Sequence, residues 1–248
     1  SPVALAYYQY AYRMSNAPAT ELSQVIAGVM FPAFSKFQTD LPRLRESYLN
    51  TVRLVSFVAV PMGIGFAVVA PAFVAAAFGS EWLPMVPAMQ LLAVYGVYRA
   101  VGKTMGALWK SVGRPDYITK TSLLKVLVIA ALIYPATARW GITGTAVLVL
   151  GVNLVVSMPI NLYITARVLE TTSLRILSET AYPLVAAGVM AAATWYVGSA
   201  VALPAWLELV VMTATGAAVY AATVLALDLG TGWGMRGDIQ RIVASIVR

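Results

Sequence analysis

Residues 54–78 read LVSFVAVPMGIGFAVVAPAFVAAAF, which is 25 positions without a charged side chain. Three more charge-free blocks follow, at Ile142–Ala166, Thr180–Leu207 and Leu209–Leu227. A helix rises about 1.5 Å per residue, so about 20 apolar residues cross the roughly 30 Å hydrocarbon core of a bilayer. No block alternates as a barrel strand would, and lipid requires backbone polar groups to be satisfied internally. The sequence therefore predicts an all-α, polytopic bundle of membrane helices.

The composition agrees with a membrane protein and excludes several kinds of site. Apolar residues make up 60% of the chain and charged residues 11%, whereas soluble domains carry about 25% charged residues. The chain has no cysteine and no histidine, which excludes disulfides, zinc sites built from these residues, and histidine-dependent catalysis. Glycine-rich nucleotide-binding loops are absent, and every aspartate falls in an expected loop or at a helix end. We therefore expect no enzyme activity, no metal and no cofactor.

Hydropathy and proline positions predict about seven transmembrane helices. The first contains Pro18, where we expect a kink. After the last helix, residues 229–248 are expected to form an amphipathic cytoplasmic tail. The expected spans are residues 3–35, 54–78, 83–110, 121–138, 142–166, 180–202 and 207–227.

The positions of the basic residues give an expected orientation. Thirteen of the 17 Lys and Arg residues fall in the loops 36–53, 110–125, 167–179 and 228–248. Cytoplasmic loops of membrane proteins are enriched in Lys and Arg. We therefore expect a multi-pass protein of the cytoplasmic membrane, with the first residue outside and the last inside. The net charge of +7 then reflects topology and contact with anionic membrane lipid and does not indicate a nucleic-acid partner.

Small residues and aromatic residues within the expected helices are interpreted as packing residues and as membrane-interface anchors, respectively. Gly63, Gly65 and Gly144 are expected where helices approach closely. Tyr and Trp residues near helix ends are expected to anchor the chain at the membrane interface. These aromatic residues are Tyr7, Tyr8, Tyr10, Tyr12, Trp82, Trp140 and Trp206.

Charged residues within the expected spans are the candidate functional residues, because a charge at the bilayer centre costs about 2.5–3.5 kcal/mol on insertion scales. Arg13 lies about ten residues into the first span, where it would bind an anion in a central cavity. Alternatively, the helix begins later, near Ser15, and Arg13 is a surface residue. Glu21 is either a site for a coupling proton or cation or a structural partner of a base elsewhere.

Arg99 and Lys103 are four residues apart and share a helix face, which Lys110 extends. This stripe is either a path for an anionic head group or a set of long side chains reaching the inner membrane interface.

Three stretches resemble a known family. They are Leu5–Ser35, with Tyr7-Tyr8-Gln9-Tyr10-Ala11-Tyr12-Arg13 and Val29-Met30-Phe31-Pro32; Phe78-Gly79-Ser80-Glu81-Trp82-Leu83-Pro84; and Gly113-Arg114-Pro115-Asp116 followed by Arg139-Trp140-Gly141-Ile142-Thr143-Gly144. Together they resemble the second half of polysaccharide-transport flippases of the multidrug/oligosaccharidyl-lipid/polysaccharide exporter superfamily. The resemblance covers most of residues 4–170.

The resemblance implies a division of the chain. Residues 1–170 would be the second transport lobe and residues 171–228 two additional transmembrane helices, with a first lobe missing from this sequence. Such proteins flip polyprenyl- or dolichyl-(pyro)phosphate-linked oligosaccharides across the cytoplasmic membrane for surface polysaccharide synthesis. The expected phosphate ligands are Arg13, Arg99 and Lys103, with Glu21 for ion coupling.

The resemblance also bears on Arg13 in particular. Ala11-Tyr12-Arg13 is similar to an Ala-aromatic-Arg pattern of related peptidoglycan-precursor flippases, whose arginine is thought to hold the pyrophosphate. The family commonly has glycine where this chain has Ala6, which makes the local backbone less permissive.

Two other functions stay open. A multidrug exporter of the same superfamily would need buried carboxylates for cationic drugs, and Glu21 is the one carboxylate in mid-span. A non-transporting scaffold of a polysaccharide synthase is also compatible with the sequence.

Overall fold

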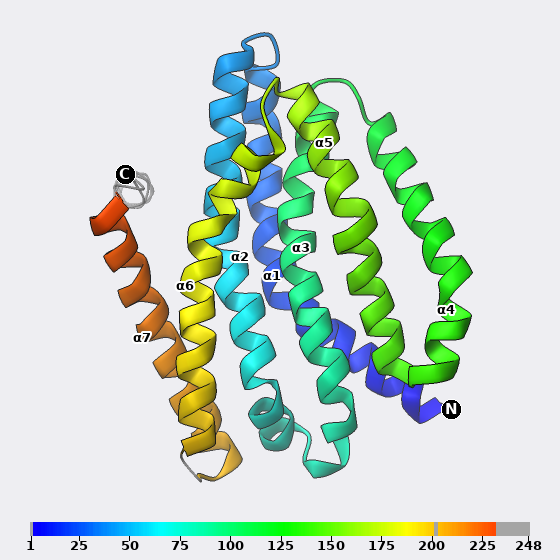
Figure 1. Cartoon of the computed structure of the whole chain (residues 1–248), viewed down its shortest axis with the longest axis vertical. Coiled ribbons are helices and arrows are strands. Elements are labelled where there is room, and N and C mark those ends of the chain that lie inside the picture. The colour runs from blue at the N-terminus through cyan, green and yellow to red at the C-terminus, as the bar shows by residue number, and fades with distance from the viewer. Residues whose placement is uncertain (1, 201–202, 232–248) are drawn as a thin grey trace.

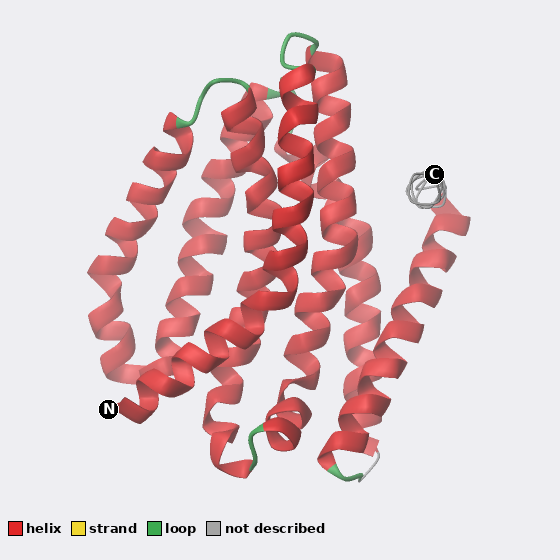
Figure 2. Cartoon of the chain, turned by 180° about the vertical axis from the view of Figure 1, so that it is seen from behind, coloured by secondary structure: helices red, strands yellow, loops and turns green. Residues whose placement is uncertain are grey.

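A computed structural model describes residues 2–200 and 203–231, and the side chains of residues 3–15, 30–200 and 203–230. Long helices run side by side and are joined by short loops at the two ends of the bundle (Figure 1). The described residues form helices and loops without strands (Figure 2). The elements are α1 (Pro2–Lys36), α2 (Leu41–Ala77), a 3-10 helix η1 (Ser80–Met85), α3 (Val86–Ser111), α4 (Asp116–Gly151), a π-helix η2 (Val152–Ser157), α5 (Met158–Val168), α6 (Ser173–Ala200) and α7 (Ala205–Thr231).

Four described segments are long and apolar enough to cross a membrane: Leu41–Ala77, Asp116–Val168, Ser173–Ala200 and Ala205–Gly230. The second is 53 residues long, and it turns back on itself within α4, so it supplies two crossings. The more polar helices α1 and α3 run beside these segments (Figure 1). The all-α helical membrane bundle expected from the sequence is therefore confirmed.

Gly141 is the point at which α4 reverses direction. Its backbone has φ 56° and ψ −138°, a conformation that side chains with a Cβ rarely adopt. The two arms then pack tightly, because a Cβ added at Gly144 would overlap the Ala136 carbonyl oxygen and lie 2.8 Å from Cβ of Trp140. This hairpin places the α4 arm beside η2 and α5 and separates the expected spans 121–138 and 142–166.

Helix α3 forms the centre of the bundle, with α1 and α2 packed against it. Gly63 allows the close approach of α2, because a Cβ there would overlap Val97 Cγ2 and lie 2.9 Å from the Ala93 carbonyl oxygen. Phe34, Tyr48 and Leu108 are fully buried and belong to one hydrophobic cluster. On its other side α2 contacts α6 and α7.

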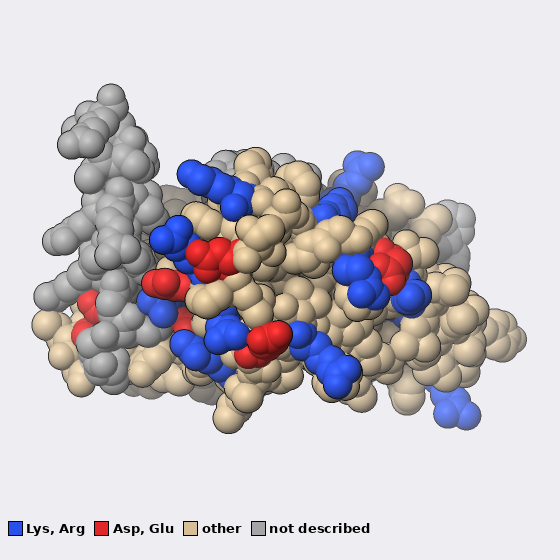
Figure 3. Space-filling model, turned by 90° about the horizontal axis from the view of Figure 1, so that it is seen from above, with Lys and Arg blue, Asp and Glu red and all other residues tan. Residues whose placement is uncertain are grey.

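The connections 37–40, 112–115 and 169–172 meet at one end of the bundle (Figure 1). Arg and Lys side chains gather there together with some acidic groups (Figure 3). The positions of these loops agree with the alternation expected from the charges, while the direction of the chain across the membrane stays a prediction. The expected tail 229–248 lies mostly outside the described residues.

The expected start of the second helix is wrong. Helix α2 begins at Leu41, not near Leu54, because Asp40 caps its first turn by accepting a hydrogen bond from the Arg43 backbone N–H at 3.3 Å. Arg53 therefore lies within a helix and not in a loop. Its guanidinium forms a partly buried ion pair with Glu179 of α6 at 2.8 Å, which joins the two helices near this end.

We predict that Gly141→Ala lowers the stability of the protein by about 1–3 kcal/mol, the usual cost of a non-glycine residue in a disfavoured backbone conformation. Thermal unfolding of the purified protein in detergent measures the effect. Gly151→Ala is the matched control: its backbone is helical (φ −60°, ψ −48°) and an added Cβ meets no atom within 4 Å. Equal melting temperatures for the two variants would contradict this account of the hairpin.

Candidate functional site

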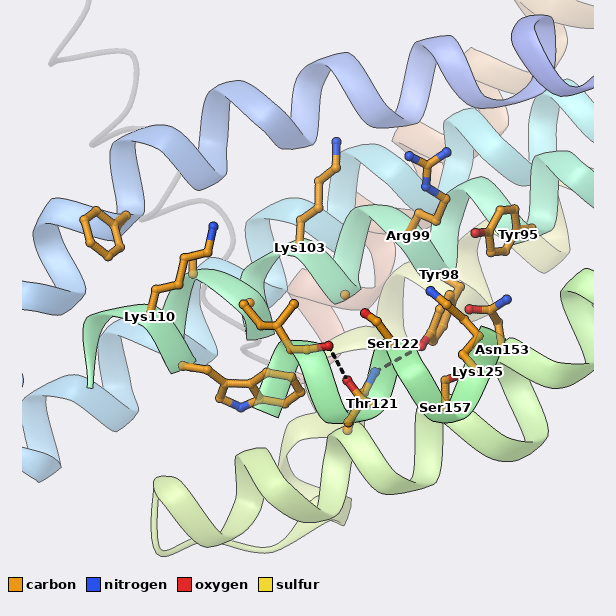
Figure 4. A pocket seen from close by; sticks show the side chains of 17 residues that line it. Tyr95, Tyr98, Arg99, Lys103, Lys110, Thr121, Ser122, Lys125, Asn153 and Ser157 are labelled. Atoms are coloured by element: carbon orange, nitrogen blue, oxygen red, sulfur yellow. Dashed lines mark hydrogen bonds between the residues drawn. The ribbon is translucent and has the colours of Figure 1, made fainter. Parts of the chain in front are cut away.

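A cleft of about 700 Å³ lies between α3, α4 and the η2–α5 segment. Figure 4 shows Arg99, Lys103 and Lys110 projecting from α3, and Asn153 and Ser157 on the wall formed by η2. Its described lining includes four cationic side chains and no carboxylate. The lining residues are Phe31, Tyr95, Tyr98, Arg99, Gly102, Lys103, Gly106, Ala107, Trp109, Lys110, Ile118, Thr121, Ser122, Lys125, Asn153, Ser157 and Asn161.

The stripe predicted on α3 lines this cleft. Arg99, Lys103 and Lys110 all contribute to the lining, and Lys110 is the most exposed of the three. Their spacing of four and seven residues places them on one helix face, which continues from the end of α3 into its middle. The structure thus brings together two of the expected phosphate ligands, Arg99 and Lys103. Whether they bind phosphate stays a prediction.

Lys125 on α4 joins this group, and sequence analysis missed it as a site residue. The sequence counted Lys125 with the basic loop 110–125, which overlaps the expected span 121–138, but α4 begins at Asp116, so Lys125 lies nine residues after the start of a helix. Its side chain is half-buried and lines the cleft. The turn Gly113-Arg114-Pro115-Asp116 was the signal for this earlier helix start, because proline and an acidic residue are favoured at helix N-termini.

Aromatic groups hold Arg99. Its Nη1 donates a hydrogen bond to the Tyr12 hydroxyl of α1 at 2.8 Å. The guanidinium carbon lies 5.9 Å from the centre of the Tyr12 ring and 5.8 Å from that of Tyr95, within the range of cation–π attraction. Tyr12 was expected to be an interface anchor, whereas the structure places it half-buried against a cleft residue. Tyr7 and Tyr10 instead pack against Trp82, with ring centres 5.3 Å apart in both pairs.

The two remaining predicted site residues lie on α1. The Arg13 side chain is exposed and is not part of the cleft lining, although its neighbour Tyr12 contacts Arg99. Helix α1 begins at Pro2, so the alternative of a later start near Ser15 is wrong. Glu21 lies in the helical backbone of α1, but its side chain is outside the described side chains. The roles expected for Arg13 and Glu21 stay predictions.

The wall opposite α3 is polar but uncharged, and sequence analysis did not single it out. Asn153, Ser157 and Asn161 recur every four residues along η2 and α5, and all three line the cleft. Asn161 Nδ2 lies 3.2 Å from the Tyr98 hydroxyl. π-Helical turns are rare and often occur at functional sites, but no sequence pattern announced this one.

A smaller cavity of about 190 Å³ adjoins the cleft and is lined almost entirely by apolar side chains. It lies between α2, α3, the η2–α5 segment and α6. Tyr98 and Gly102 line both spaces. The cationic cleft therefore has an apolar neighbour on the other side of these two residues.

Residues 1–87 match a family described as polysaccharide biosynthesis protein. Over this part, the chain is similar to that family. Residues aligned with the lipopolysaccharide biosynthesis protein WzxC of Escherichia coli (strain K12) are 35% identical over 118 positions, covering 48% of the chain and 24% of WzxC. The teichuronic acid biosynthesis protein TuaB of Bacillus subtilis (strain 168) is 33% identical over 113 positions, covering 46% of the chain and 23% of TuaB.

A more distant relative is aligned along most of the chain. The succinoglycan biosynthesis transport protein ExoT of Rhizobium meliloti (strain 1021) is 22% identical over 225 residues, covering 89% of the chain and 45% of ExoT. An alignment of this length must reach into the helices after residue 170, where the sequence had shown agreement in hydropathy alone. The resemblance to polysaccharide exporters is confirmed. The chain covers less than half of each of these relatives, and no solved structure matches it.

We predict that a cysteine replacing Ser122, which lines the cleft, reacts faster with a negatively charged, membrane-impermeant thiol reagent than with a positively charged one. The expected ratio of rates is on the order of tenfold, the lower end of what charged clefts give. The chain contains no native cysteine, so labelling is specific. Lys125→Gln should reduce the ratio. Leu127→Cys is the control, since Leu127 is 59% exposed but outside the cleft lining, where lipid would shield it. No labelling of Ser122→Cys, or equal rates for the two reagents, would contradict a cationic aqueous cleft.

Proposed function

We propose that this chain is part of a transporter that moves lipid-linked oligosaccharide across the cytoplasmic membrane for surface polysaccharide synthesis. The observation that carries the proposal is the cationic cleft in a chain whose relatives are polysaccharide biosynthesis proteins. One of those relatives, ExoT, is described as a transport protein. The proposed activity is translocation and not catalysis.

The proposed ligand of the cleft cations is the phosphate or pyrophosphate that joins a polyprenyl or dolichyl carrier to its glycan. Arg99, Lys103 and Lys125 offer N–H donors from two different helices to one space, and phosphate oxygens accept such hydrogen bonds well. Lys110, at the exposed end of the stripe, would attract the head group first. Each charge-assisted hydrogen bond contributes about 1.5–3 kcal/mol, so several of them can hold a phosphate.

We further propose that the cleft works together with a first lobe of similar helices. The relatives are about twice as long as this chain, since 118 aligned residues cover 24% of WzxC. In this arrangement the exposed Arg13 side chain on α1 would bind phosphate from the side of the first lobe, and Glu21 would couple transport to a proton or sodium gradient. The proposed orientation places the first residue outside and the loops 37–40 and 112–115 in the cytoplasm.

The multidrug-exporter alternative receives less support. Binding of cationic drugs needs buried carboxylates, and the described lining of the cleft has four cations and none of these groups. The scaffold alternative predicts that surface polysaccharide survives removal of the cleft charges. An experiment that removes these charges therefore separates a scaffold from a transporter.

The test uses a strain that lacks the full-length gene and receives it back with substitutions. We expect Arg99→Ala, Lys103→Ala and Lys125→Ala each to weaken phosphate binding by about ten- to hundredfold, and the triple variant to abolish surface polysaccharide. Arg13→Ala is expected to abolish it as well, through the role that the resemblance implies. Quantified surface polysaccharide and the amount of transporter in the membrane are the two readouts.

Lys120→Ala is the matched control for these variants. Lys120 lies on the same helix as Lys125 but is exposed, pairs with Asp116 at 2.9 Å and is outside the cleft lining. This variant should export normally. Normal surface polysaccharide from the triple variant, at a normal level in the membrane, would refute phosphate binding by the cleft and favour the scaffold.

A further inference from the structure

Asn153 offers the cleft an acceptor group that the described protein does not use. Its side chain is 1% exposed, and Nδ2 donates to the Val149 carbonyl oxygen at 2.7 Å. A carbonyl oxygen can only accept, so this bond fixes which end of the amide is nitrogen. Oδ1 is then buried without a hydrogen-bond partner among the described residues.

A structural role explains only half of this side chain. A π-helix shifts the backbone hydrogen-bond pattern, and Nδ2 satisfies a carbonyl next to that shift. The bond to Val149 leaves Oδ1 unexplained, and a buried acceptor without a partner destabilises a protein. In a cleft of about 700 Å³ water can satisfy it until a ligand group replaces the water.

The chemistry of the cleft limits which ligand group this can be. Phosphate oxygens at neutral pH are mainly acceptors and do not bind an acceptor oxygen. A metal cation would be repelled by Arg99 and Lys125, which line the same space. A neutral hydroxyl group donates one hydrogen bond and accepts another, so it fits both the amide oxygen and the neighbouring cations. Figure 4 shows Asn153, Ser157, Tyr98 and Lys125 together at the end of the cleft away from Lys110.

We propose that the wall formed by Asn153, Ser157 and Asn161 binds hydroxyl groups of the sugar unit next to the phosphate. The inference rests on the proposed function and adds a glycan subsite to it. The cations of α3 and α4 hold the phosphate, and the amide and hydroxyl groups of η2 and α5 contact the attached sugar. This wall therefore distinguishes a glycosylated carrier lipid from a bare one.

Asn161 and Tyr98 extend the subsite. The Tyr98 hydroxyl can accept from or donate to the Asn161 amide, so Asn161 presents either its oxygen or its nitrogen to the cleft. Ser157 adds a hydroxyl between the two amides and is 5% exposed. Polar groups four residues apart on a helix are separated by about 6 Å, so they suit hydroxyls at different positions around a sugar ring.

The test measures binding of two probes to the purified full-length protein: a polyprenyl pyrophosphate, and the same lipid with one hexose attached. The wild-type protein should bind the glycosylated lipid more tightly. Asn153→Leu should weaken binding of the glycosylated lipid by about three- to tenfold, the value of one neutral hydrogen bond, and leave the bare lipid unchanged. Ser157→Ala, which removes one oxygen and little volume, should act in the same direction.

Thr165→Val is the matched control, because Thr165 is a fully buried polar residue of α5 outside the cleft lining. It should bind both probes like the wild type. Equal loss of both probes in the Asn153 and Ser157 variants, or no loss of either, would overturn the subsite. Equal affinity of the wild type for the two probes would overturn the subsite alone, whereas binding of neither probe would overturn the proposed function with it.

Discussion

Positive side chains held inside an apolar helix bundle are the constraint on which this architecture depends. Arg99 and Lys103 lie 13 and 17 residues after the start of α3, about 20–26 Å along the helix by its rise. A charge at such a depth is costly in lipid, so it requires polar surroundings. In the structure these cations line a cleft between α3, α4 and the η2–α5 segment. The Tyr12 hydroxyl and the Tyr95 ring orient Arg99, and uncharged polar groups form the opposite wall.

Two backbone irregularities lie in the segment that borders this cleft. The reversal at Gly141 returns the chain beside α4, and Asn153 and Ser157 of the π-helix that follows line the cleft. The outer surface of α4 is apolar and exposed at Leu123, Leu127 and Tyr134, which suits contact with lipid or with another helical lobe. One helix thus presents an apolar surface on one side and Lys125 on the other, which allows a single segment to separate membrane from cleft.

Much of the fold and part of the site could be predicted from the sequence. Long charge-free blocks sufficed for the helices, and the four-residue spacing of Arg99 and Lys103 sufficed for a shared face, because both follow from helix periodicity. Lys125 was missed because it was counted with the basic residues of the loop 110–125, whereas α4 begins at Asp116 and hydropathy does not locate a helix start among charged residues. The Asn153 wall was missed because a π-helix arises from packing, and an isolated asparagine in an apolar block carries no charge signal. Tyr12 and Arg13 are neighbours on α1, but Tyr12 contacts Arg99 whereas the Arg13 side chain is exposed. Helix periodicity alone does not decide which of two adjacent residues faces the bundle.

The central claim is that the cationic cleft serves the passage of a phosphate-linked glycan from one leaflet to the other. The most direct measurement is the leaflet distribution of lipid-linked oligosaccharide in a strain without the full-length gene, with other flippases of the same glycan removed. The account predicts accumulation in the cytoplasmic leaflet and loss of the outer-leaflet pool. An unchanged distribution between the leaflets would contradict the account.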